Sequence, residues 1–286
     1  MPRALLLLLG ACATLGMVVT GLPAGPGAAR AAPDRDRMMV LGDSVMVDAY
    51  PGVAAAARAT GRIKPFSNAF PAFGLSNQPW RKRYRAAIRE RRPDVVVNMI
   101  GGFDVEAARD DPVGYSATVA AAMRLLSDDG RILVWIGMLP GNGRFVDDGL
   151  RRALNEILRT EAADLPRRVV YLDPDPVFAG ADGVSAEILP GPDGTPVRIR
   201  KVDGTHLCPD GAALLGLMVV DALRGPLGLS SARPLPDGAW VRGRWRKDPV
   251  YTESDAFDAR TLELTSDVCP PASSSSGSAS DSGAGS

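Results

Sequence analysis

Short apolar runs separated by helical patterns are the feature that most constrains the fold of this chain. Such runs lie at residues 38–41, 94–100, 132–138 and 169–172. Between the first two, Trp80, Tyr84 and Ile88 recur at four-residue spacing, which indicates an amphipathic helix at 77–92. Strands without polar alternation are buried on both faces, and parallel strands need a crossover between them. The sequence therefore predicts a three-layer α/β/α sandwich with a central parallel sheet, of the flavodoxin-like kind.

The remaining elements continue this alternation. We expect further helices at 54–60, 112–126, 150–158 and 212–223, and a hairpin at 188–199 that turns at Asp193-Gly194. The α/β domain is thus placed at residues 38–226. Residues 227–269 have no long periodic run, which indicates an arm packed on the domain. The serine- and glycine-rich stretch 270–286 predicts a disordered tail.

Residues 1–31 have the composition of a secretory signal peptide. A basic start precedes an apolar run at 4–20, and small residues follow up to an A-x-A pattern, so we expect cleavage after Ala31. Two alternatives stay open. The run is just long enough for an uncleaved membrane anchor, and the residues up to Cys12 resemble a lipoprotein signal. All three interpretations place the rest of the chain outside the cytoplasm, as a secreted or extracytoplasmic protein.

Two cysteines, Cys208 and Cys269, remain once the signal is removed. An even number of cysteines in an exported chain favours a disulfide, so we expect these two to be joined. The alternative is a pair of free thiols. A bond would tie the far end of the arm to the loop before the last helix.

Polar residues follow three of the predicted strands. Gly42-Asp43-Ser44, residues 101–104 and Asp173 all lie where a strand ends. Parallel sheets place their functional sites at the carboxyl ends of their strands, so these segments should meet at one edge. The chain has a single histidine, His206, which follows Asp203 by three residues and precedes the last predicted helix.

Ser44, His206 and Asp203 match the roles that acyl transfer requires: a nucleophile, a base that takes its proton, and a group that orients the base. With Asp203 at Nδ1 of the ring, Nε2 would face Ser44. Each motif alone is common by chance, and the alternative is a turn serine and a locally bonded histidine. Their order, their positions at the two ends of one domain and the single histidine favour a catalytic triad.

Over residues 38–224 the chain resembles the SGNH (GDSL-like) hydrolase superfamily, and most closely its bacterial exported, cell-envelope branch. The resemblance rests on Gly42-Asp43-Ser44 as the first block and on residues 203–206 as the last. It implies that the backbone amides of Ser44 and Gly74 bind the oxyanion that forms during acyl transfer.

One block departs from the family pattern. The third block is Gly-x-Asn-Asp, and its Asn also donates to the oxyanion, but here Phe103 stands at that position. Loss of one such donor typically lowers the rate about 10²–10³-fold. Asn98 lies inside the preceding strand and is not expected to replace the missing donor.

The sequence thus predicts an exported serine esterase that hydrolyses a small acyl ester, with a cell-envelope glycan as the expected carrier of the acyl group. One alternative is an O-acyltransferase that uses the same triad and passes the acyl group to another hydroxyl. The other is a non-catalytic envelope-binding protein, which only Phe103 favours.

Composition argues against several other classes. Thirty-three Lys and Arg balance 33 Asp and Glu, so nothing indicates a nucleic-acid partner. We expect no cofactor and no metal, because one histidine and two distant cysteines cannot build a zinc site and Asp173 and Asp175 lack ligand spacing. The arginines of the helix at 77–92 indicate a solvated face, with contact to anionic wall polymers or lipid head groups as the alternative. The oligomeric state is left open.

Overall fold

The structure is a computed structural model that describes residues 36–142, 144–180, 183, 185–190, 196–229, 269, 270 and 272. The expected signal peptide, nearly all of the arm and the tail, and the turn of the hairpin lie outside these residues. Within the described part of the chain, no helix combines the length and the apolar character needed to cross a bilayer.

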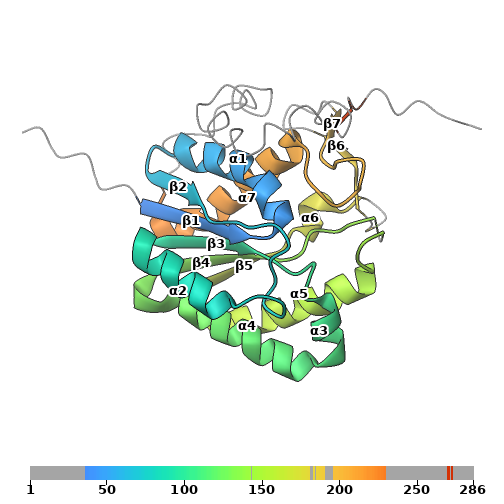
Figure 1. Ribbon diagram of the computed structural model, residues 1–286. Coiled ribbons are helices and arrows are strands. Elements are labelled where there is room, and N and C mark those ends of the chain that lie inside the picture. Colours follow the sequence, from blue (N-terminus) through green and yellow to red (C-terminus); the bar gives the residue numbers. More distant parts are fainter. Residues whose placement is uncertain are drawn as a thin grey trace, which may run out of the picture. The chain divides into compact units, whose positions relative to one another are not determined.

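Five parallel strands form the centre of the fold in the order β2-β1-β3-β4-β5 (Figure 1). Their bounds are β1 Asp36–Gly42, β2 Ile63–Ser67, β3 Val95–Met99, β4 Ile132–Ile136 and β5 Val169–Leu172. In the inner strands, Val40 of β1 lies opposite Val97 of β3, which lies opposite Val134 of β4. All three side chains are buried, because the sheet is covered on both faces.

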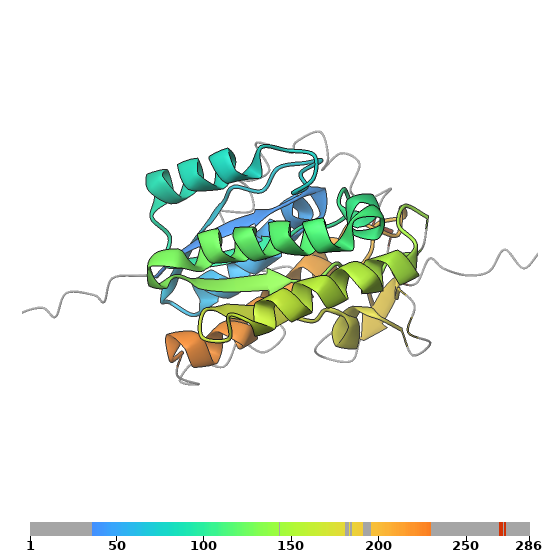
Figure 2. The same ribbon diagram turned by 90° about the horizontal axis from the view of Figure 1, so that it is seen from below.

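Helices cover both faces and complete the predicted layers (Figures 1 and 2). One face carries α1 (Ser44–Ala59) and α7 (Pro209–Leu227), and the other carries α2 (Trp80–Arg91), α4 (Pro112–Ser127) and α5 (Asp148–Ala163). Successive strand residues point to opposite faces. Val40 therefore joins the core under α1 and α7, while Leu41 joins the core under α2, α4 and α5. The predicted α/β/α sandwich is confirmed.

The helices α1 and α7 approach each other closely. A Cβ on Gly52 of α1 would lie 2.2 Å from the carbonyl of Ala212 in α7, and a Cβ on Gly216 would lie 2.5 Å from the Gly52 carbonyl oxygen. Glycine at both positions lets the two backbones meet. This contact positions the site, because α1 begins at Ser44 and α7 begins shortly after His206.

Several elements differ from the sequence expectations. The first helix begins at residue 44 rather than 54, because Asp43 caps it. The pattern does not predict β2, whose sequence IKPFS contains Pro65. As an edge strand, β2 tolerates that proline. Two short helices, α3 (Val105–Asp110) and α6 (Asp175–Phe178), also lie beyond the pattern. The predicted hairpin forms from antiparallel β6 (Ile188–Pro190) and β7 (Pro196–Arg198).

Candidate active site

Ser44 lies at the turn between β1 and α1, at the carboxyl edge of the sheet. A Cβ on Gly42 would lie 2.5 Å from the Met99 carbonyl oxygen, so glycine is required where β1 ends. Asp43 then caps the helix, since its Oδ1 accepts a hydrogen bond from the Val45 amide at 3.0 Å. The close turn and the cap together make Ser44 the first residue of α1.

The structure brings Ser44, His206 and Asp203 together. Nε2 of His206 lies 2.9 Å from Oγ of Ser44, and Nδ1 lies 2.6 Å from Oδ2 of Asp203. Oδ1 of Asp203 accepts from the backbone amides of Thr205 and His206, at 2.9 and 3.0 Å. Asp203 therefore orients the ring and also holds the backbone of its own loop. In this arrangement the imidazole can act as a base for the serine hydroxyl.

Two carboxyl groups of the site, Asp203 of the triad and the neighbouring Asp43, have pKa values shifted in opposite directions. Burial raises the pKa of Asp203, but hydrogen bonds from the Thr205 and His206 amides and from the imidazole outweigh burial and lower it. Asp203 is therefore ionised at neutral pH. Burial also raises the pKa of Asp43, and in this case it prevails over the Val45 amide and His206, so the pKa is about 6.

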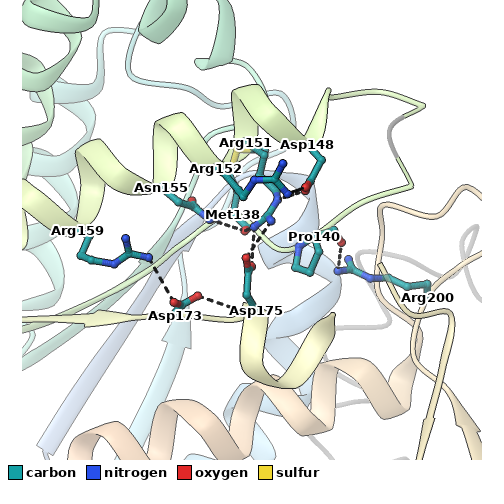
Figure 3. Close-up of polar contacts among 10 residues, drawn as sticks. All are labelled: Met138, Pro140, Asp148, Arg151, Arg152, Asn155, Arg159, Asp173, Asp175 and Arg200. Atoms are coloured by element: carbon teal, nitrogen blue, oxygen red, sulfur yellow. Dashed lines mark hydrogen bonds and ion pairs between the residues drawn. The ribbon is translucent and has the colours of Figure 1, made fainter. Parts of the chain in front are cut away.

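A buried arginine braces the loop that carries Asp203 and His206. Arg200 donates from Nη1 to the Thr205 carbonyl and from Nη2 to the Pro140 carbonyl, each at 2.6 Å; Figure 3 shows the contact with Pro140. The triad loop is thereby tied to the segment that follows β4. The sequence does not mark this role, because the partners of Arg200 are backbone carbonyls that any residue can supply.

Ser44 and His206 line a cavity of about 300 Å³. Most of its wall is apolar, and it includes Ile100, Phe103, Met138, Leu139, Phe145 and Val146. Phe103 and Phe145 are 49% and 64% exposed, which places their rings at the mouth of the cavity. The wall comes from the segments after β3 and β4, so the cavity lies at the carboxyl edge where the sequence places the site.

The amide of Gly74, which the family resemblance gives as an oxyanion donor, already has a partner in this structure. Its amide donates to Oδ1 of Asn77 at 3.0 Å, and Gly74 is not among the residues that line the cavity. Its loop is held by Asp104, whose carboxylate accepts from the amides of Leu75 and Ser76 at 3.0 and 2.8 Å. The Gly74 amide is thus paired within its own loop and is not free to bind an oxyanion in this arrangement.

Neither Asn98 nor Phe103 supplies a side-chain donor. Asn98 is fully buried in β3, where its Oδ1 accepts from the Tyr84 hydroxyl at 3.2 Å. It does not line the cavity, which agrees with its place inside the strand. Phe103 contributes only an apolar ring.

A disulfide joins Cys208 and Cys269 in the structure, with the two Cα atoms 5.8 Å apart. The next residue, Pro270, accepts a hydrogen bond through its carbonyl from Nε of Arg198 at 2.8 Å. Cys208 directly precedes α7 and lies two residues after His206. The described C-terminal segment is therefore fastened beside the triad loop.

The aspartates after β5 pair with arginines. Arg151 of α5 donates to both carboxylate oxygens of Asp175, at 2.6 and 2.9 Å, and Arg159 lies 3.3 Å from Asp173 (Figure 3). These arginines supply the positive charge that a bound cation would otherwise provide. In the part of the chain that is described, no group of His, Cys, Asp and Glu side chains is arranged to hold a metal ion.

The fold is that of the SGNH hydrolases, as comparison with solved structures confirms. A candidate SGNH hydrolase from Slackia heliotrinireducens is similar with a TM-score of 0.50 and 18% identity, over 66% of this chain and 100% of that one. A GDSL-like lipase from Bacteroides thetaiotaomicron VPI-5482 has the same TM-score and 13% identity, over 67% of this chain and 89% of that one.

Residues 37–222 match the family model described as a protein of unknown function, DUF459. The match spans well over half of the chain, so the chain belongs to this family. A search of curated proteins gives no match.

Proposed function

We propose that the protein is an exported serine esterase that hydrolyses esters of small apolar acyl groups. The observation that carries the proposal is the hydrogen-bonded series from Asp203 through His206 to Ser44, on the wall of an apolar cavity. A carboxylate, an imidazole and a hydroxyl at these distances have the geometry of an acyl-transfer triad.

In the proposed reaction, Oγ of Ser44 attacks the ester carbonyl carbon while Nε2 of His206 takes the hydroxyl proton. Asp203 stabilises the resulting imidazolium and keeps the ring oriented. The imidazolium then protonates the departing alkoxide, which leaves as the alcohol, and an acyl-serine remains. The neutral imidazole next deprotonates a water molecule that attacks the acyl-serine. The acid product leaves and Ser44 regains its proton from His206.

The apolar lining of the cavity favours an apolar acyl group as the part of the substrate that the protein encloses. Side chains such as Met138 and Phe145 offer no hydrogen bonds to a sugar, whereas they pack well against methylene groups. We therefore place the acyl group in the cavity and the alcohol outside its mouth. The alcohol that we propose is a hydroxyl of a cell-envelope glycan, because an exported enzyme meets esters of that kind. Transfer to a second hydroxyl would pass through the same acyl-serine.

The proposal is tested by replacing the nucleophile. Ser44→Ala should lower esterase turnover by at least about 10⁴-fold, because it removes the oxygen that forms the acyl intermediate. Its melting temperature should stay near that of the wild type. Hydrolysis of p-nitrophenyl esters of increasing chain length measures the loss and also reports the preferred acyl group.

Labelling by a fluorophosphonate probe provides an independent readout. Ser67→Ala, which changes an exposed serine of β2, is the matched control and should retain both labelling and turnover. Full activity in Ser44→Ala would exclude Ser44 as the nucleophile. An unlabelled, inactive wild type would favour the envelope-binding alternative.

We further propose that the protein carries the Cys208–Cys269 disulfide in an oxidising, extracytoplasmic compartment. The two cysteines are 61 residues apart, for which the chain-entropy treatment gives about 4 kcal/mol of stabilisation. Mass spectrometry of unreduced, alkylated protein should find the two peptides linked. Recovery of both cysteines in alkylated form from freshly exported material would contradict this proposal.

A further inference from the structure

The proposed reaction needs donors for the oxyanion, and two donors of the family pattern, the third-block Asn side chain and the Gly74 amide, are not free here. Phe103 has no side-chain donor, and the Gly74 amide is paired with Asn77. We propose that the backbone amide of Gly102 serves as the oxyanion donor in place of the usual asparagine side chain, together with the amide of Ser44. This inference rests on the proposed function of Ser44.

Gly102 lies in a turn that leaves its amide free. Asp104 N donates to the Gly101 carbonyl at 2.8 Å, which closes a β-turn over residues 101–104. The Gly101 carbonyl thus points into the turn. The peptide bond that follows is trans, so the Gly102 N–H points the opposite way. Among the described residues, no oxygen accepts from this amide.

Gly102 is placed beside the nucleophile. It lines the same cavity as Ser44 and His206. A Cβ on Gly102 would have Oδ2 of Asp43 as its nearest contact, at 3.9 Å, so residue 102 stands next to the turn that carries Ser44. Even a Cβ at residue 102 would meet nothing nearer than 3.9 Å, so a substrate carbonyl has space to approach this amide.

The Ser44 amide is the natural second donor. It is the first amide of α1, and the cap provided by Asp43 is directed to the next amide, that of Val45. The first amides of a helix have no partner within the helix, and the helix dipole favours negative charge at that end. Two amides from different strand ends would then converge on the oxyanion.

The turn is held rigidly enough to act as a preorganised donor. The Asp104 side chain is fully buried and accepts from the amides of Leu75 and Ser76, from the Ser76 hydroxyl and from the Tyr115 hydroxyl. These bonds fix the residue that closes the turn. Electrostatic stabilisation of an oxyanion is effective when its donors need no rearrangement during the reaction.

The test removes one N–H and leaves the turn in place. Gly102→Pro lacks the amide hydrogen, and residue 102 is the second residue of the turn, a position that proline favours. Gly102→Ala is the matched control, because it keeps the amide and its Cβ meets nothing nearer than 3.9 Å. We expect kcat of Gly102→Pro to be about 10²–10³-fold below that of Gly102→Ala, with KM within about threefold. Equal kcat values in two folded variants overturn the inference.

A second variant covers the case in which proline prevents folding. Incorporation of lactic acid at position 102 replaces the amide by a backbone ester and removes the same N–H without a ring. Against Gly102→Ala, it should show a loss of the same order, and an unchanged kcat refutes the proposal. Ser44→Ala distinguishes a failure of the proposed function from a failure of the Gly102 role. If Ser44→Ala stays active, the proposed function fails, whereas an inactive Ser44→Ala with equal residue-102 variants contradicts the Gly102 role alone.

Discussion

Two arginines are buried at the carboxyl edge of the sheet, and their charges are compensated in different ways (Figure 3). Arg151 is 2% exposed and forms ion pairs with Asp148 and Asp175. Burial lowers its pKa, but the hydrogen bonds to these carboxylates prevail and raise it. Arg200 is 1% exposed, donates only to the carbonyls of Thr205 and Pro140, and forms no ion pair with any described residue. Burial lowers its pKa to about 10.

The difference in charge compensation indicates different roles: Arg151 supports the fold, and Arg200 supports the site. Arg151 joins the start of α5 to the start of α6 and also donates to the Met138 carbonyl at 3.2 Å. Asn155 holds the same carbonyl, and none of the partners of Arg151 lies in the loop of Asp203 and His206. Arg200 leaves its own Nε without a partner and holds the loop of Asp203 and His206. A buried charge without an ion pair is costly for folding. We infer that Arg200 is a positioning residue whose contribution is the alignment of the triad.

The largest expected effect is on stability, from Arg151→Met. Removing the guanidinium leaves Asp175 without its counter-ion and Asp148 with Arg152 alone, both at partly buried positions. We expect the free energy of unfolding to fall by about 3–4 kcal/mol. Activity per folded molecule should stay within about twofold of the wild type. Chemical denaturation, with esterase assays on the folded fraction, measures both quantities.

Arg152→Met is the matched control for that experiment. Arg152 also pairs with Asp148, but its side chain is 60% exposed, so its loss should cost less than about 1 kcal/mol. If the two variants were equally stable, the role given to Arg151 in this comparison would be wrong.

The reverse pattern is expected for Arg200→Met. The loss of two hydrogen bonds is offset by the removal of an unpaired buried charge, so stability should change by less than about 1.5 kcal/mol. The triad loop loses its tie to Pro140, and a small displacement of His206 can cost about 100-fold in kcat. KM should change less than kcat, because Arg200 and Pro140 form only a small part of the cavity wall.

Arg200→Lys tests whether the positive charge alone is enough to position the triad loop. Lysine keeps the charge but cannot span both carbonyls with a planar fork, so it should recover only part of kcat. A kcat for Arg200→Met close to the wild type, or a loss of stability as large as that of Arg151→Met, would show that Arg200 is a structural residue like Arg151.

The same contrast explains which parts of the molecule the sequence predicts. Ser44, Asp203 and His206 can be predicted from the sequence because their chemistry lies in a rare combination of side chains. The strands can be predicted because burial on both faces leaves unbroken apolar runs. The role of Arg200 cannot be predicted from the sequence, since its partners are backbone carbonyls. The pairing of the Gly74 amide is equally hidden, because it depends on a loop conformation that the buried Asp104 organises from a distant segment. The edge strand β2 lacks an apolar run because only part of it is buried.

Asp43 extends the comparison to a buried negative charge. Its side chain is 5% exposed, and burial raises its pKa from 3.8 to about 6. Between these two pH values the folded protein holds a proton that the unfolded chain has released. The free energy of unfolding therefore falls as pH rises through this window, and the loss persists above pH 6. Asn at position 43 cannot ionise, yet it caps a helix as well as Asp does.

The smallest expected effect is accordingly the pH dependence of Asp43→Asn. Its stability relative to the wild type should rise by about 2 kcal/mol between pH 4.5 and 7.5, because only the wild type ionises a buried carboxyl over that range. Urea denaturation at a series of pH values measures the difference, and titrating groups that do not interact with Asp43 cancel between the two proteins. Asp43→Ala serves as a second reference, since it removes both the charge and the cap and should be less stable than Asp43→Asn by about 1 kcal/mol at every pH. A difference between Asp43→Asn and the wild type that does not change with pH would mean that the Asp43 carboxylate has a partner when ionised. Asp43 would then be a buried charge with a compensating partner, like Arg151, and not one without an ion pair, like Arg200.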